Sequence, residues 1–320
     1  MPGEDPPGPS DVLFVRGASA DLKLVLLDGA PVYAPFHLGG LVNTFDPELL
    51  RAATLHLGGA PARYDGGISY VLDLETRAPR RSAFHSAGSA DLLAGRARVE
   101  GPAGDALAYL VAARAVHGFG ARTFARAGLP YGYADGLVRL DADVGLAGSV
   151  GLTLFVNRES VGLDSASLGG EPARWGNAAG SLRYRGAVGA ADAEITAAFG
   201  SFEAALPLGG NKPVLAEGAS RRARVAADFT LGAGGTALRY GTSFDRVWLR
   251  YAARPRAGRP GRFTALARRL APMACRLAPI SRRAAGLPGR AERRLHAQWC
   301  GAACGARSPT LTPPRACAIS

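Results

Sequence analysis

The stretch LVLLDGAPVYAPFHLGGL, residues 24–41, begins with branched apolar residues and ends in proline, aromatic and glycine residues. Its first part is typical of a buried strand, because aliphatic side chains pack well on a pleated surface. Asp28 and Gly29 predict a tight turn at the end of this strand, and a stiff loop follows. The residues that carry the loop pattern are Pro31, Tyr33, Pro35, Gly39 and Gly40.

The residues that follow predict a small α+β segment. Asp46 and Pro47 fit an N-cap with a proline at the first helical position, so we expect a short helix through Ala52. Strands are expected at residues 22–27, 54–57 and 68–74. Glycines between them, at Gly58, Gly59 and Gly67, allow the backbone conformations that turns require.

The middle of the chain predicts a different architecture. In GLVRLDADVGL, residues 136–146, Arg139, Asp141 and Asp143 alternate with apolar residues and so share one face of a strand. The pattern recurs and predicts about eight strands of roughly eight to eleven residues, arranged in four hairpins. Further charges assigned to the polar face are Arg183, Arg185 and Asp228.

The connections between these strands indicate an up-and-down antiparallel sheet. Turns within hairpins span about four to six residues, whereas residues 118–136, 159–176 and 200–221 form longer connections. A soluble β-sandwich also shows such alternation. Many charges on the polar face, and aromatic residues near strand ends, favour an outer-membrane barrel with lipid outside and water inside. These aromatic residues are Tyr131, Tyr133, Phe155, Tyr184, Phe199, Phe202, Tyr240 and Phe244.

Residues 11–77 resemble the second half of the plug domain of TonB-dependent outer-membrane receptors. The resemblance rests on six motifs in order, VRGAS, LVLLDGAPVY, PFHLGGL, FDPELL, LGGAPARYDGG and SYVLDLETR. The residues that mark the plug fold in these motifs are Arg16, Gly17, Asp28, Gly29, Pro31, Tyr33, Pro35, Gly39, Gly40, Gly58, Gly59, Arg63, Tyr64 and Gly67.

The resemblance implies a mainly β fold, in which a plug remnant is followed by the first strands of an incomplete transmembrane barrel. It also implies a location in the outer membrane, contact with its lipid, an extracellular ligand of unknown identity and an energising inner-membrane TonB-type protein. No nucleic acid is expected as a partner. We expect the polar-face charges to point into the lumen and to hold the plug through many weak, hydrated contacts rather than one strong buried pair.

The chain departs from the family pattern at both ends. No signal sequence, no first half of the plug and fewer than half of the barrel strands are recognisable. We therefore expect a receptor fragment that does not transport by itself. The expected divisions are a disordered segment at 1–10, the plug half at 11–79, the partial barrel at 80–252 and a basic tail at 253–320.

The tail carries the positive charge of the whole chain. The net charge of the 320 residues is +12, but residues 253–320 hold 14 arginines and one acidic residue, leaving 24 basic against 25 acidic residues before them. The composition of the tail favours out-of-frame translation over a functional basic arm. The alternative reading is a soluble β-sheet binding module whose arm binds nucleic acid or an anionic membrane.

Enzyme signatures do not occur in the sequence. It contains no phosphate-binding loop, nucleophile elbow or paired metal-binding histidines, so neither an enzyme nor a cofactor is expected. The cysteines of HAQWCGAAC, residues 296–304, lack a second pair, which argues against a zinc site. The single histidines are interpreted as loop or core residues, namely His37, His56, His85, His117 and His296.

Overall fold

The structure is a computed structural model, and two sheets organise the residues that it describes. These are residues 23–37, 42–57, 60–61, 63–64, 70–126, 130–162, 172–208, 214–233, 236–255, 276–277 and 280–283. We call residues 23–77 the plug segment and strands β7 to β15 the large sheet. Arg16, Gly17, Gly39, Gly40, Gly58, Gly59 and Gly67, together with the cysteine-containing stretch 296–304, lie outside the described residues.

The plug segment forms a four-stranded sheet in the order β2-β1-β6-β5. Its strands are β1 (Lys23–Leu27), β2 (Ala30–Pro31), β5 (Leu50–Leu57) and β6 (Tyr70–Thr76). Only the β1–β6 pair is parallel. A second, short pair joins β3 (Phe36–His37) to β4 (Val42–Asn43).

The expected helix begins where the sequence predicts but is shorter. Asp46 is the N-cap, its side chain accepting a hydrogen bond from the Glu48 backbone amide at 3.0 Å, and a 3-10 helix spans Pro47–Leu49. The expected end at Ala52 is wrong, because β5 already begins at Leu50 and pairs with β6. Pairing in the sheet therefore overrides the local helix signal after a single turn.

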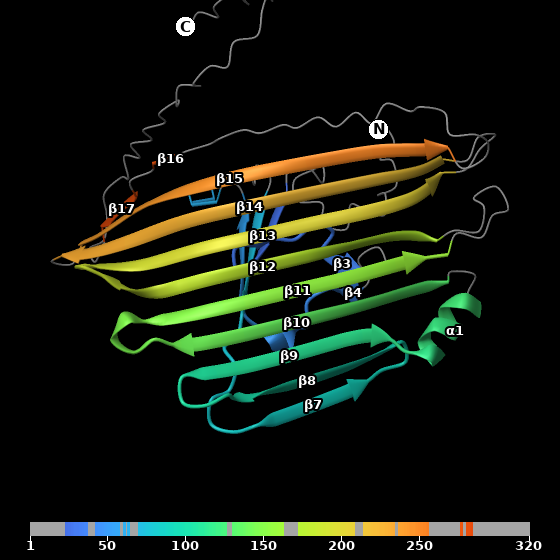
Figure 1. The fold of residues 1–320 in the computed structure, drawn as a ribbon, viewed down its shortest axis with the longest axis horizontal. Coiled ribbons are helices and arrows are strands. Elements are labelled where there is room, and N and C mark those ends of the chain that lie inside the picture. Colours follow the sequence, from blue (N-terminus) through green and yellow to red (C-terminus); the bar gives the residue numbers. More distant parts are fainter. Residues whose placement is uncertain are drawn as a thin grey trace, which may run out of the picture. The chain divides into compact units, whose positions relative to one another are not determined.

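The large sheet is an antiparallel meander in which each strand pairs with the next (Figure 1). Helix α1 (Gly118–Arg126) connects β9 to β10, and two short strands, β16 (Arg276–Leu277) and β17 (Ile280–Arg283), pair with β15. Among the described strands β7 pairs with β8 alone, so the sheet does not close. The strands are β7 (His85–Ala90), β8 (Ala94–Pro102), β9 (Leu107–Val116), β10 (Tyr131–Asp143), β11 (Ser149–Val161), β12 (Ala173–Val188), β13 (Ala191–Leu208), β14 (Val214–Ala233) and β15 (Thr236–Pro255).

The predicted incomplete barrel sheet of a mainly β fold is confirmed, with two corrections to its strands. The later strands are longer than expected, reaching 20 residues in β14 and β15, and the three long connections shrink accordingly. Backbone pairing between β11 and β12, for example, continues through Arg158 and Arg174, although these polar residues interrupt the apolar alternation. Strand β7 was not predicted, because its sequence HSAGSA has small residues without alternation.

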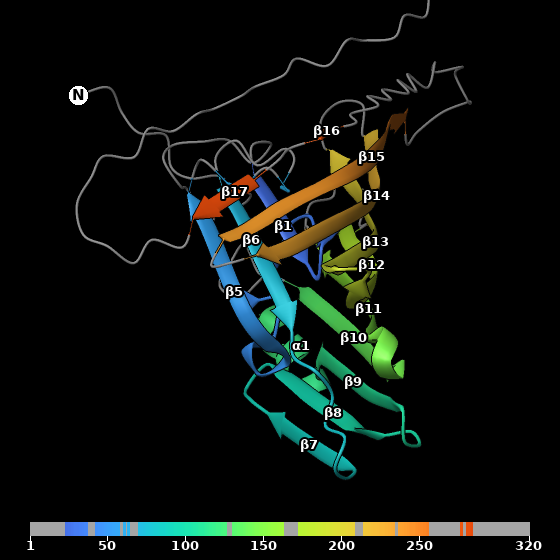
Figure 2. The same cartoon turned by 90° about the vertical axis from the view of Figure 1, so that its left-hand side faces the viewer.

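A shared core joins the plug segment to the inner face of the large sheet (Figure 2). Leu27 and Tyr70 of the plug segment are almost fully buried, as is Leu110 of the sheet. The inner face is thus apolar in its middle as well as charged. The buried residues of this core are Val25, Leu27, Ala30, Val32, Phe45, Leu49, Tyr70, Leu74, Leu110, Ala112, Leu137, Phe155, Ala179 and Ala198.

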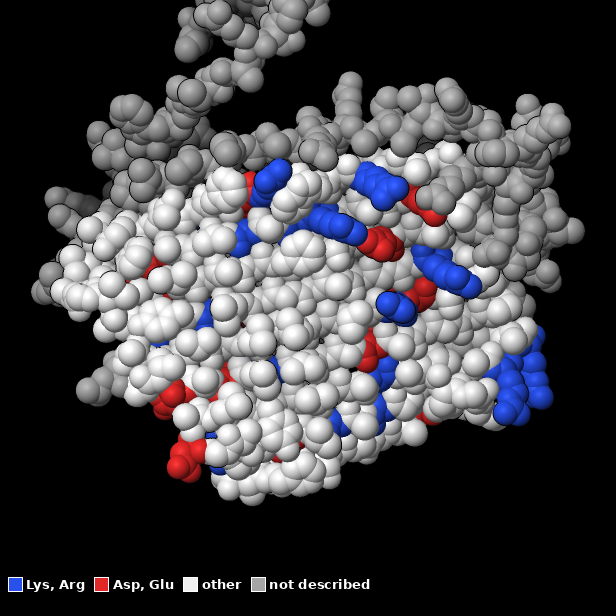
Figure 3. Space-filling view, in the orientation of Figure 1, with Lys and Arg blue, Asp and Glu red and all other residues white. Residues whose placement is uncertain are grey.

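The outer face of the large sheet exposes apolar side chains. Large areas of this face carry no charge in Figure 3, which views it from the side away from the plug segment. Exposed apolar residues of the central strands include Leu154, Val156, Leu182, Ile195, Phe199, Val225 and Phe244. In the described part of the chain no helix combines the length and hydropathy needed to span a membrane.

Candidate functional site: the contact between plug segment and large sheet

The turn after β1 brings Asp28 to the large sheet. Asp28 and Gly29 both have positive φ angles, 49° and 86°, which tighten the reversal from β1 into β2. Glycine adopts this conformation at no steric cost, and aspartate is among the few other residues that tolerate it. Asp28 is 1% exposed, so the turn inserts a carboxylate into a buried environment.

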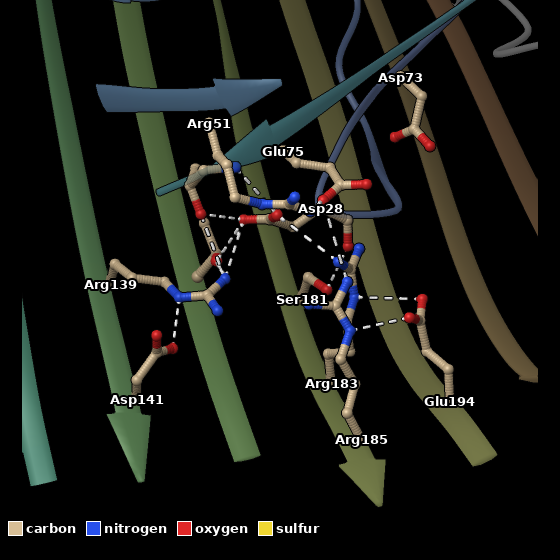
Figure 4. Close-up of polar contacts among 12 residues, drawn as sticks. Asp28, Arg51, Asp73, Glu75, Arg139, Asp141, Ser181, Arg183, Arg185 and Glu194 are labelled. Carbon is tan, nitrogen blue, oxygen red and sulfur yellow. Dashed lines mark hydrogen bonds and ion pairs between the residues drawn. The ribbon is translucent and has the colours of Figure 1, made fainter. Parts of the chain in front are cut away.

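The Asp28 carboxylate is satisfied by both parts of the molecule (Figure 4). From the plug segment, Thr76 donates its backbone N–H at 3.1 Å and its hydroxyl. From the large sheet, the Thr153 hydroxyl donates at 2.6 Å and Arg139 Nη1 at 3.2 Å. Arg139 is itself held by Asp141, which accepts a hydrogen bond from its Nε at 2.6 Å.

A second arginine approaches Asp28 from strand β12. The Ser181 hydroxyl donates to the Asp28 backbone carbonyl at 2.6 Å, and Arg183 Nη1 lies 3.8 Å from Asp28 Oδ1. Arg183 Nε is 3.6 Å from Glu194 Oε1 but makes no hydrogen bond, so this contact is an ion pair only. Arg185 donates to Glu194 at 2.8 Å and lies 4.0 Å from Glu75 of β6.

These contacts form one buried network, which we call the Asp28 junction: Asp28, Thr76, Arg139, Thr153, Ser181 and Arg183. A buried carboxylate is tolerated when it is paired and its remaining lone pairs accept hydrogen bonds. Asp28 meets both conditions only while the plug segment lies against β10, β11 and β12. The junction therefore couples the position of one turn to three strands of the large sheet, which we also call the wall.

The loop after β2 follows the sheet closely. Tyr33 donates its backbone N–H to Asn177 Oδ1 at 2.8 Å, and its ring lies 6.1 Å from that of Phe202. Pro31 approaches Gly200 so closely that a Cβ on Gly200 would lie 2.1 Å from the Pro31 carbonyl oxygen. Gly200 is therefore required by the approach of the plug segment.

His37 makes the second polar contact with the wall. It has no exposed surface, and its ring stacks on Tyr133 of β10 at a centroid distance of 4.3 Å. Its Nε2 lies 2.7 Å from Asp135 Oδ1 in β10, and its Nδ1 lies 2.9 Å from Glu159 Oε1 in β11. The contact of Nε2 with Asp135 is a hydrogen bond. His37 Nδ1 and Glu159 Oε1 are close, but they are not aligned as a hydrogen bond.

Further contacts surround a pocket between the helical turn and strands β7 to β11. Arg96 pairs with Asp46 at 3.1 Å, and Arg98 donates to Glu48. A pocket of about 320 Å³ lies here, and Arg114 and Asp135 are among the residues that line it. At the end of β6, Arg77 donates two hydrogen bonds of 2.7 Å to Glu100 of β8. The prediction that only weak, hydrated contacts hold the plug segment is therefore wrong, because the buried ion pair of Asp28 with Arg139 acts beside these exposed pairs.

Several predicted site residues meet at this interface and others do not. Asp143 instead caps a turn, accepting a hydrogen bond from the Gly145 backbone at 3.0 Å. Asp228 interacts electrostatically with Arg63 of the plug segment. The backbone carbonyl of Arg63 accepts a hydrogen bond from Arg224 of β14. Pro35 accepts a backbone hydrogen bond from Thr44 within the plug segment. The residues that meet at the interface are Asp28, Pro31, Tyr33, Arg63, Arg139, Asp141, Arg183 and Arg185.

Tyr64 belongs to a separate cluster within the plug segment. Its hydroxyl donates to Asp73 at 2.6 Å and accepts a hydrogen bond from Arg63. Burial and the hydrogen bond to Asp73 raise the pKa of Tyr64 to about 12. Tyr64 therefore remains a neutral hydrogen-bond donor at physiological pH.

Sequence reasoning missed the partners that complete the interface. The interpretation of His37 as an ordinary loop or core residue overlooked its two carboxylate partners, and no short motif marks Asp135 or Glu159. Their positions on the polar face of β10 and β11 were the only signal available. Within the described ranges, no group of three or more His, Cys, Asp or Glu side chains is arranged to hold a metal ion.

Comparison with known proteins identifies the fold. No family model and no curated protein matches the sequence. Among solved structures, the siderophore receptor PirA from Acinetobacter baumannii aligns over 73% of this chain with 15% identity and a TM-score of 0.53. The pyoverdine outer membrane receptor FpvA from Pseudomonas aeruginosa aligns over 78% with 14% identity and a TM-score of 0.53.

A third solved structure, the ferric citrate transporter FecA, aligns over 80% of this chain with 15% identity and a TM-score of 0.54. The chain spans less than half of each of these proteins, 41%, 46% and 42% of their lengths. It therefore shares the fold of one portion of such receptors. The three matched proteins are receptors and a transporter by name, not enzymes.

Proposed function

We propose that this chain, which has the fold of TonB-dependent outer-membrane receptors, is the plug-and-wall portion of a receptor for energised uptake. The observation that carries the proposal is the combination of two faces on one sheet. The inner face buries a plug segment through the Asp28 junction, while the outer face exposes apolar side chains. In a soluble sandwich the outward-facing residues of each strand would instead be polar.

The outer membrane is the environment that fits this outer face. In such barrels, lipid-facing apolar residues alternate with residues that face a polar lumen. The proposed partners are the membrane lipid, a TonB-type energising protein of the inner membrane and an extracellular ligand. By analogy with the named receptors and ferric citrate transporter, the proposed ligand class is an iron(III) chelate of the siderophore or citrate type.

The plug segment offers a route by which energy could be used for transport. It is tied to the wall by polar contacts at its turns and by a modest shared core. Pulling on it would break hydrogen bonds to the wall one after another. As the chain covers only part of such a receptor, we do not propose that it completes transport by itself.

The proposal is tested by exporting the full chain behind a bacterial signal sequence and fractionating the cells. We expect the chain in the outer-membrane fraction, released by detergent and not by salt. Release by salt, together with binding to nucleic acid that weakens steeply with ionic strength, would instead support the soluble module with a basic arm.

Ligand binding is tested separately on the detergent-solubilised full chain. Equilibrium binding of radiolabelled ferric citrate and ferric pyoverdine is expected to be saturable, with the iron-free chelators as controls. Membrane insertion without any saturable binding would contradict the ligand class and leave the location supported.

A further inference from the structure

The surroundings of His37 differ from those of an ordinary core histidine. Both ring nitrogens face carboxylate oxygens, Nε2 that of Asp135 at 2.7 Å and Nδ1 that of Glu159 at 2.9 Å. The two carboxylates belong to different strands of the wall and are themselves buried, with side chains 8% and 1% exposed. A single plug side chain thus connects two neighbouring wall strands.

The protonation state of His37 decides whether this arrangement is favourable. A neutral imidazole carries one N–H donor and one lone pair, whereas the imidazolium ion donates from both nitrogens. In the neutral form, one carboxylate would face a lone pair at hydrogen-bonding distance. In the charged form, both carboxylates face a donor, and the ion pairs offset the cost of burial.

The remaining charged and titratable groups around His37 reinforce this balance. Arg114 of β9 donates to Asp135 at 2.8 Å and 2.6 Å, and the Tyr131 hydroxyl donates to Glu159 at 2.5 Å. Tyr133 stacks on the imidazole, and Arg114 Cζ lies over the Tyr133 ring, 5.2 Å from its centroid. Asp91 of the β7–β8 turn acts on Tyr133 electrostatically. With His37 charged, the four closest ionised groups, two basic and two acidic, sum to zero.

The same cluster holds both strands of the β3–β4 pair. His37 lies in β3, and Arg114 donates to the backbone carbonyls of Asn43 and Thr44, at the end of β4, at 2.7 Å and 2.9 Å. Asp135 connects the contact at β3 with the contact at β4, because it accepts hydrogen bonds from both His37 and Arg114. Loss of the proton on His37 would therefore loosen one strand directly and leave Glu159 without a compensating charge.

We propose that His37, Asp135 and Glu159 form a proton-binding latch that fastens the β3–β4 pair of the plug segment to strands β10 and β11. The proton is the ligand, and its loss releases this part of the plug segment from the wall. The pocket described above is lined by two members of this cluster, Asp135 and Arg114. This inference does not depend on which substrate the receptor carries.

The direction of the pH dependence follows from the contacts. Burial alone would lower the pKa of His37, but the contacts with Asp135 and Glu159 outweigh burial and raise it above 6.5. The stabilisation is therefore fully present below pH 6.5 and is lost as the pH rises through the raised pKa. In that window the ratio of the closed to the released state should fall by up to about tenfold per pH unit.

Hydrogen–deuterium exchange of the full chain in detergent micelles tests the latch. Exchange of the peptide covering residues 35–45 is measured from pH 6 to pH 9 and corrected for the intrinsic rate, with β6 as an internal reference. We expect its protection to fall with rising pH by about tenfold or more, while that of β6 stays constant. The variant His37→Gln should exchange fast at every pH, and the control His56→Gln should behave as wild type.

A second measurement keeps the proposal testable if His37→Gln does not fold. NMR titration of histidine-labelled wild type should show one imidazole that titrates above 6.5, and Glu159→Gln should shift it downward. A pH-independent protection of residues 35–45 in folded wild type would overturn the latch. So would the absence of a histidine titrating above the ordinary value.

Discussion

Among the described residues of the plug segment, Asp28 accepts the largest set of hydrogen bonds from the large sheet, from Arg139, Thr153 and Ser181. Replacing it by asparagine keeps its size but removes the charge that compensates Arg139 and Arg183 in a buried site. Arg139 and Arg183 keep Asp141 and Glu194 as partners but lose a buried acceptor, so we expect Asp28→Asn to lower the free energy of unfolding by about 1–3 kcal/mol. Urea titration of the full chain in detergent micelles measures this change.

Asp143→Asn is the matched control for this prediction. Asp143 is an exposed aspartate at the end of β10 whose side chain only caps a turn. Asparagine retains an acceptor oxygen there, so the change should stay within about 0.5 kcal/mol. Equal losses in both variants would show that the Asp28 junction has no special role.

Gly200 sets how closely the loop after β2 can approach the wall. A Cβ at this position would lie 2.1 Å from the Pro31 carbonyl oxygen and 2.7 Å from Pro31 Cγ. We expect Gly200→Ala to displace the loop and to destabilise the protein by about 1–3 kcal/mol, as overpacking does. The control is Gly232→Ala in β14, where a Cβ would meet nothing within 4 Å.

The sequence predicted some of the residues that form this interface. The resemblance marked Asp28, Pro31 and Tyr33, and alternation placed Arg139 and Arg183 on the inner face. The pairing between them depends on how two segments more than 100 residues apart dock, and no local pattern encodes that register. His37 is a core residue, as expected, but its partners could not be predicted for the same reason, since they lie on β10 and β11.

At the scale of the element, periodicity predicted strands better than their ends. The apolar alternation of β10 to β15 fixed which face each residue occupies, but the ladders continue through polar residues that mask the pattern. Backbone hydrogen bonds between neighbouring strands do not require an apolar side chain. Strand length was therefore underestimated wherever charged residues such as Glu203 and Arg221 occupy the outer face.

The outer face of the strands yields a depth-dependent prediction. Val225 lies in the middle of β14 and is 54% exposed, whereas Val188 ends β12 and is 48% exposed. If this face contacts lipid, Val225→Lys should cost about 2–4 kcal/mol and Val188→Lys about 0–1 kcal/mol. Unfolding titrations in lipid vesicles compare the two variants, and equal costs would argue against a bilayer around these strands.

At the scale of the whole molecule, the mainly β class and the combination of plug segment and open sheet were predictable. Composition showed that the net positive charge of the chain resides in residues 253–320, so this charge is not a property of the two predicted sheets. The divisions at residues 10, 79 and 252 stay predictions, although β15 continues to Pro255. The absence of catalysis also stays a prediction.

The central claim is that one face of the large sheet meets lipid while the other meets the plug segment. Phe199 points outward and is 42% exposed, whereas Trp175 lies opposite Glu159 on the inner face. Two variants of the full chain are compared in vesicles with brominated acyl chains. In the first variant Trp175 is the single tryptophan. In the second variant the single tryptophan is introduced by Phe199→Trp. All other tryptophans of each variant are replaced by phenylalanine.

We expect bromine to quench the fluorescence of the Phe199→Trp variant strongly and that of Trp175 weakly. Equal quenching of both, or quenching of neither, would contradict a sheet that separates lipid from a plug.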